Sequence, residues 1–119
     1  MPDPAQLGRP SRLSCPQCGG VLNEVSEPGS TRFRCQIGHA FTAESLVAAQ
    51  DDELERALAS ALRMHRERVV LFRRMQDKSA AQQLQHAAAR WRQGADESEQ
   101  SAKVIAEALA NLRKASAAD

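Results

Sequence analysis

The stretch "RFRCQIGHAF", residues 32–41, places Cys35 four positions before His39, with a glycine directly in front of the histidine. Upstream, "SCPQCGG", residues 14–20, supplies the only other two cysteines of the chain. Two ligands so close in sequence reach one ion only where the chain turns sharply, and a glycine beside each pair permits such a turn. Thiolates and imidazole suit zinc, and this spacing is typical of a zinc ribbon. The predicted ligands of a Zn²⁺ ion are Cys15, Cys18, Cys35 and His39.

Four protein ligands close the coordination shell, so we expect a structural zinc ion. A catalytic zinc usually keeps one position open for water. Two competing interpretations are an iron-sulfur cluster with one histidine ligand, and cysteines that are simply buried hydrophobic side chains. Residues 14–41 contain only six sizeable apolar side chains. So small a core is rarely stable without a metal or a disulfide, which favours the structural metal.

The same segment is predicted to form a β-hairpin. "VLNEV", residues 21–25, and "TRFR", residues 31–34, are short runs with strand propensity. Between them, Pro28 and Gly29 fit the two central positions of a type II turn. The hairpin would carry one ligand pair at each end. Residues 14–41 are therefore predicted to form a zinc ribbon, and residues 1–13, with three prolines, a disordered N-terminal lead.

From Thr42 onward the chain has no proline and a single glycine, Gly94, which predicts a helical segment over residues 42–115. Thr42 is the predicted N-cap of a first helix over about 43–77. Apolar side chains then recur at spacings of three, four and seven, as expected for one face of a helix. These residues are Leu54, Leu58, Leu62, Val69, Phe72 and Met75.

A second helix is predicted over about 79–114, with Ser79 as its N-cap. Its proposed seam alternates spacings of four and three, which is a heptad pattern. The seam residues are Leu84, Ala88, Trp91, Ala95, Ser98, Ala102, Ile105, Leu109 and Leu112. We predict a small α+β protein in which a zinc-ribbon β-hairpin head precedes a long antiparallel α-helical hairpin. The alternative is one continuous helix in an intermolecular bundle.

Composition and motifs narrow the functional classes. The formal net charge is +1, so overall charge indicates no particular partner. The chain has no apolar run long enough to span a membrane, and its N-terminus lacks the features of a secretory signal. We therefore expect a cytoplasmic protein with no membrane partner. Nucleophile elbow, phosphate-binding loop and dinucleotide-binding motifs are all missing, so we expect no enzymatic activity.

Charge is unevenly distributed along the helical segment. Residues 63–92 carry eight basic side chains against two acidic ones. Such a patch favours contact with phosphates or with an acidic partner. The candidate contact residues are Arg63, Arg66, Arg73, Arg74, Arg90 and Arg92. Nucleic-acid binding is the alternative function. A protein partner or a homo-oligomer is favoured, because Val70, Leu71 and Val104 lie outside the main stripes and offer a second apolar surface.

Three stretches carry a family resemblance: "CPQCGGVLNE", "RFRCQIGHAFTAESLVAAQ" and "LERALASALRMHRERVVLFRRM". Residues 14–76 resemble the zinc ribbon and helical tail that follow the catalytic domain of bacterial chemotaxis methylesterase-like proteins. The resemblance implies a metal-binding accessory module in a bacterial signalling context, with the family's ligands at the cysteines and histidine predicted above. The esterase domain has no counterpart in this chain, so the family's activity is not carried over.

Overall fold

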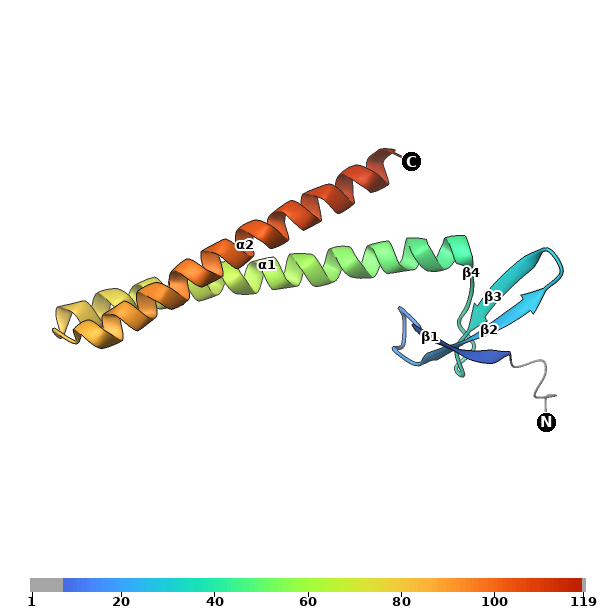
Figure 1. The fold of residues 1–119 in the computed structure, drawn as a ribbon, viewed down its shortest axis with the longest axis horizontal. Coiled ribbons are helices and arrows are strands. Elements are labelled where there is room, and N and C mark those ends of the chain that lie inside the picture. The colour runs from blue at the N-terminus through green and yellow to red at the C-terminus, as the bar shows by residue number, and fades with distance from the viewer. Residues whose placement is uncertain (1–7, 119) are drawn as a thin grey trace. The chain divides into compact units, whose positions relative to one another are not determined.

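The computed structural model describes residues 8–118 (Figure 1). Four strands form one antiparallel sheet in the order β1-β2-β3-β4, and two long helices follow. The predicted class, a small α+β fold with a helical hairpin, is confirmed. The chain divides into two compact units, with the boundary between Glu53 and Leu54. The elements are β1 (Arg9–Ser14), β2 (Val21–Glu27), β3 (Ser30–Arg34), β4 (Ala40–Thr42), α1 (Ala43–Ala81) and α2 (Gln85–Ala118).

Strand β1 corrects the prediction that residues 1–13 form a disordered lead. It pairs antiparallel with β2, although the register shifts between Pro10 and Ser14. Proline lacks an amide hydrogen and is tolerated because β1 is an edge strand of the sheet. The Ser11 hydroxyl also donates a hydrogen bond to the Leu22 carbonyl at 2.6 Å. The correction applies to residues 9–13, and residues 1–7 lie outside the described part of the chain.

The β2–β3 hairpin forms at the predicted turn. Glu27 pairs with Ser30, so Pro28 and Gly29 make a two-residue connection. Gly29 has a φ of 82°, the value that the third position of a type II turn requires. Strand β2 begins at the predicted residue and continues two residues further than expected. Local turn chemistry therefore sets this part of the fold.

A small core holds the first unit together. Leu22, Phe41 and Leu46 are buried beside two of the cysteines, and Phe33 and Ala49 pack against them. Leu46 comes from the start of α1, whose predicted cap is present: the Ser45 amide donates to the Thr42 hydroxyl at 3.0 Å. The Thr42 amide donates in return to the Ser45 hydroxyl at 2.9 Å. This reciprocal pair fixes where α1 begins.

The turn between the helices lies later in the chain than predicted. Ser79 is not an N-cap but a buried residue in the last turn of α1. The Leu84 amide donates to the Ser79 carbonyl at 2.9 Å, and the Gln83 amide donates to the Ala80 carbonyl at 3.0 Å. These two bonds define a Schellman motif, whose left-handed residue is Gln83, with a φ of 62°. Because glycine normally marks this position, the chain carries no clear sequence signal of the turn.

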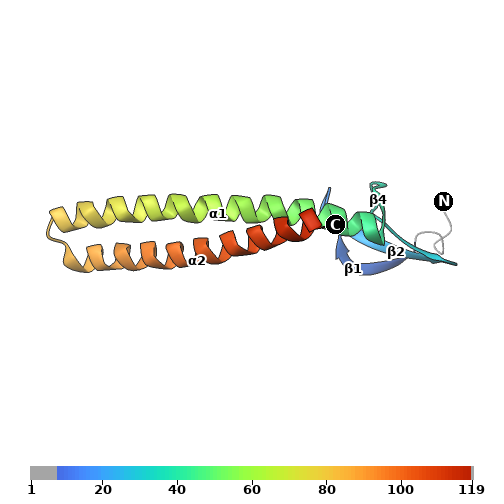
Figure 2. The same ribbon diagram turned by 90° about the horizontal axis from the view of Figure 1, so that it is seen from above.

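Helices α1 and α2 run antiparallel, side by side (Figure 2), and the seam predicted for α2 is largely confirmed. Its buried members are Ala88, Ala95, Ser98 and Leu109, whereas Leu84 is half-exposed at the turn. Across the seam the rings of Phe72 and Trp91 are tilted, with centroids 5.7 Å apart. Neither helix, within the residues described, combines the length and apolar character that crossing a membrane demands.

Candidate metal centre

The first ligand pair is presented by the turn between β1 and β2. The Cys15 amide donates to the Gly20 carbonyl at 2.7 Å, and the Gly19 amide donates to the Cys15 carbonyl at 2.8 Å. Gly19 has a φ of 77°, in the left-handed region that side chains other than glycine rarely adopt. These bonds curl residues 15–20 around the two cysteines.

The second pair is presented by the turn between β3 and β4, which uses the same device. The Cys35 amide donates to the His39 carbonyl at 3.0 Å, and the Gly38 amide donates to the Cys35 carbonyl at 3.2 Å. Gly38 has a φ of 113°. The His39 amide also donates to the Cys35 sulfur at 3.3 Å, a contact that favours a thiolate there.

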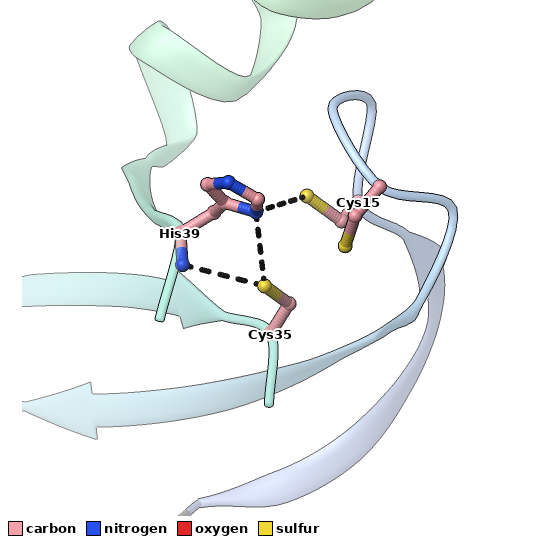
Figure 3. Close-up of side chains that lie close together, drawn as sticks. Cys15, Cys35 and His39 are labelled. Carbon is pink, nitrogen blue, oxygen red and sulfur yellow. Dashed lines mark hydrogen bonds between the residues drawn. The ribbon is translucent and has the colours of Figure 1, made fainter. Parts of the chain in front are cut away.

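The four predicted ligands converge. One ligand atom from each of Cys15, Cys18, Cys35 and His39 lies within 4.8 Å of the others. The Nδ1 atom of His39 faces two sulfurs, at 3.6 Å from Cys15 and 3.3 Å from Cys35, so Nδ1 is the nitrogen directed into the centre (Figure 3). All three cysteines are free thiols. The arrangement can hold a metal ion.

Geometry and donor chemistry both fit a tetrahedral ion. With metal–sulfur bonds near 2.3 Å and metal–nitrogen bonds of 2.0–2.1 Å, the edges of a tetrahedron are about 3.6 Å between nitrogen and sulfur and about 3.8 Å between sulfurs. The two observed distances from His39 are already close to that edge. A single Nδ1 hydrogen cannot be well aimed at two sulfurs at once. A shared cation accounts for the convergence better than hydrogen bonding does.

The cysteines differ in exposure and acidity. Cys15 and Cys35 are 2% and 3% exposed, whereas Cys18 is at the surface. Burial opposes ionisation of Cys35, but the amides of His39 and Gly38, with smaller contributions from Cys18 and Ile37, lower its pKa to about 6. For Cys18, the Gly20 amide acts to lower the pKa, but partial desolvation and the neighbouring Cys15 and Cys35 thiols raise it. Cys35 is thus better prepared than Cys18 to bind a cation at neutral pH.

The predicted basic patch is not one cluster. Arg73 donates hydrogen bonds to the carboxylates of Asp96 and Glu99, at 2.8 and 3.3 Å, and these acceptors raise the pKa of Arg73. Arg63 forms an exposed ion pair with Glu67 at 3.4 Å. The remaining candidates, all exposed, are Arg66, Arg74, Arg90 and Arg92. Part of the expected positive charge is therefore neutralised within the hairpin.

Two further features of the helices bear on function. A groove of about 450 Å³ is lined by Arg63 and Arg66 together with Arg113, which was not among the candidates. Arg113 is distant in sequence and reaches the groove only because α2 runs back along α1. The second feature is His65, whose Nδ1 atom is buried with no hydrogen-bond partner among residues 8–118. Its heptad position beside Leu62 was the available signal.

The fold and the site together define a small α+β protein with a Cys₃His centre able to hold a metal ion, followed by a helical hairpin. The chain matches no known family model, and no curated protein or solved structure is significantly similar to it. The metal centre and the surfaces of the hairpin are therefore the features that bear on function.

Proposed function

We propose that this protein is a non-catalytic interaction module whose first unit is held together by a structural Zn²⁺ ion. The observation that carries the proposal is the convergence of four ligand atoms within 4.8 Å from two glycine-containing turns. Zinc is favoured because three thiolates and one imidazole suit it, and four protein ligands leave no position for a reacting water. Zinc binding would add its free energy to folding, about 10–16 kcal/mol in zinc-finger peptides.

The first unit needs such a contribution. Besides the two buried cysteines, the buried apolar side chains of this core among residues 8–53 are Leu22, Phe41 and Leu46. A core of this size rarely stabilises a fold unaided. Because Cys15 and Cys35 are themselves part of the core, a metal would tie both ligand turns to it. This placement supports a structural role for the ion.

Metal analysis of the purified chain tests the site. We expect one zinc per chain, near-complete loss of zinc in Cys35→Ser, and full retention in Gln36→Ser, which alters the exposed neighbouring residue of the same turn. The helical circular dichroism signal should largely persist in both variants. An iron-sulfur cluster would be recognised by its visible absorption. Zinc retained by Cys35→Ser would refute the ligand assignment.

The helical hairpin is proposed to supply the protein contact. Its support is a set of half-exposed apolar side chains on both helices, including Leu71 and Val104. The resemblance to the tail of chemotaxis methylesterase-like proteins suggests a cytoplasmic bacterial signalling protein as the context. Nucleic-acid binding is the competing function, supported by an open hollow of about 650 Å³ near the turn, which Arg90 and Arg92 line.

Fluorescence anisotropy of a labelled DNA duplex separates the two functions. With zinc-loaded protein, the interaction module predicts no binding at physiological salt. Micromolar binding that falls steeply with salt, and that is lost when Arg66, Arg90 and Arg92 are changed to serine, would instead establish a phosphate contact. Arg73→Ser is the matched control, because that arginine is already engaged by two carboxylates.

A further inference from the structure

The helical hairpin exposes more large apolar side chains than it buries. Among residues 54–117, the large apolar side chains that are buried are Leu62 and Leu109, at 8% and 5% exposure. Six others are about half-exposed: Leu54, Met64, Val70, Leu71, Leu84 and Val104. Two helices alone have one seam between them and little interior, whereas four helices enclose a core. The hairpin therefore lacks a covering surface for much of its apolar area.

The ion pairs show which side of the hairpin is apolar. Arg73 follows the seam residue Phe72, and its partner Glu99 follows the seam residue Ser98. Residues one position after the seam therefore share one side of the hairpin, and residues one position before the seam share the other. Val70 falls on the charged side, apart from Leu71, so the predicted second apolar surface does not include it.

The side that precedes the seam is almost free of charge on α1. Between Leu54 and Met75, it carries a single charged residue, Arg68, whose guanidinium lies 5.0 Å from the Phe72 ring centroid. On α2, Val104 stands among small residues on the same side. We call this surface the Met64 face, and its apolar α1 members are Leu54, Ala57, Ala61, Met64, Leu71 and Met75. Leu54 and Met75 were predicted on the stripe, but the heptad spacing continues through Glu55 and Gln76, so both lie one position before the seam.

We propose that a second copy of this chain covers the Met64 face, with the two α1 helices packed antiparallel across a two-fold axis at Met64. The inference rests on the protein-contact role of the hairpin and is independent of the metal. In an antiparallel pair of helices, residues at the same height have numbers that add to a constant. The ion pairs Glu55–Arg113 and Arg73–Asp96 give sums of 168 and 169, which fixes the residues of α1 and α2 that lie at the same height. Met64 therefore lies level with Val104, and the same axis passes between the two Val104 side chains.

Size complementarity supports this register. With Met64 against Met64 of the second copy, residues whose numbers add to 128 lie opposite each other, so Leu71 lies opposite Ala57. On either side of the axis a large residue thus meets a small one, as interdigitated helix packing requires, while the flexible Met64 side chains meet at the axis itself. On α2, Ser101 and Ala108 flank Val104 and leave room for its counterpart.

Charge complementarity supports the antiparallel direction and the choice of a second copy as partner. Residues 63–92 carry eight basic and two acidic side chains, whereas residues 43–62 carry five acidic side chains and only Arg56 as a base. An antiparallel pair places the basic segment of each copy along the acidic segment of the other. Arg63, Arg66 and Arg73 lie on the charged side, away from the Met64 face, so the attraction acts between the segments and not through direct ion pairs. A parallel pair would instead place like charges together.

Sedimentation equilibrium of the zinc-loaded chain tests the association. We expect a mass of about 26 kDa, twice the 13.0 kDa of one chain. Met64→Glu should give the monomer mass with an unchanged helical signal. Val70→Glu, which alters an equally exposed residue on the charged side, should remain a dimer. A monomeric parent chain at about 100 µM, or a dimer in Met64→Glu, would overturn the proposal.

A distance measurement tests the direction of packing. A spin label at Gln82→Cys marks the turn, 18 residues beyond Met64, so the antiparallel pair separates the two labels by about 54 Å at 1.5 Å per residue. A parallel pair would bring them within about 20 Å, because helix axes pack 8–10 Å apart. The parent chain, labelled identically, corrects for reaction at the native cysteines. Loss of zinc without loss of the dimer would count against the metal proposal alone.

Discussion

The conformation of Gln83 gives the sharpest test of how the helices connect. Gln83 lies just after the end of α1 and has a φ of 62°. It is part of the Schellman motif, in which the Gln83 amide donates to the Ala80 carbonyl and the Leu84 amide donates to the Ser79 carbonyl. For a residue with a side chain, this left-handed conformation costs roughly 1–2 kcal/mol. Glycine avoids that cost but loses about 0.5–1 kcal/mol through its greater freedom in the unfolded chain. Gln83→Gly should therefore stabilise the hairpin by about 1 kcal/mol.

Thermal unfolding followed at the helical circular dichroism band measures this change. A gain of about 1 kcal/mol corresponds to about 4–8 °C in the midpoint for a unit of 60–100 residues. Ala80→Gly is the matched control, because a glycine three residues earlier lies within the helix and should lower stability by about 1 kcal/mol. Ser79→Ala should have little effect, whereas a Ser79 N-cap would lose about 1 kcal/mol. A lower midpoint in Gln83→Gly, with a loss in Ser79→Ala, would refute this position of the turn.

Three further changes probe the metal centre and the hairpin. Leu22→Ala should destabilise the first unit by about 2–5 kcal/mol and weaken zinc retention against a chelator, because Leu22 is fully buried beside the cysteines. Gly38→Ala should lower zinc affinity roughly tenfold, because alanine is strained at the φ of 113° that Gly38 adopts. Gly20→Ala should retain the affinity, because Gly20 has an ordinary φ and space for a methyl group. Equal zinc affinities in the two variants would contradict a backbone cause. Arg113→Gln should lower the free energy of unfolding by less than about 1 kcal/mol, and the loss should vanish at high salt, because the ion pair of Arg113 with Glu55 is exposed. A larger loss that does not depend on salt would indicate a buried contact.

The head was predictable because its determinants are local. Two ligand pairs of fixed spacing and the Pro28–Gly29 turn specify a hairpin independently of the rest of the chain. Strand β1 was missed because it depends on a partner strand: Pro10 argues against a strand, and the pairing with β2 is irregular. Edge strands of this kind have little signature of their own in the sequence.

The two antiparallel helices could be predicted from the sequence, but the polar residues in the seam of α1 and the position of the turn could not. Leu58, Leu62, Val69 and Phe72 lie on the predicted stripe, but His65 and Ser79 also occupy the seam of α1. Polar side chains are admitted there because α2 presents alanine and serine opposite, so burial depends on the partner helix. Because the turn contains no glycine or proline, the heptad spacing of the apolar residues alone could not locate the point where the chain reverses.

The protein-contact and nucleic-acid functions both depend on the charge of the basic segment 63–92. In the proposed antiparallel pair, the basic segment 63–92 of each copy lies along the acidic start of α1 in the other, so the carboxylates of the second copy lower the positive potential that would attract phosphates. A polyanion that binds this segment must therefore favour the monomer, because a ligand shifts an equilibrium toward the state that it binds more tightly. Duplex DNA added to the dimer at low salt should leave its mass unchanged if the arginines serve the second copy. Dissociation into DNA-bound monomers would show instead that phosphate is the preferred partner of the basic segment.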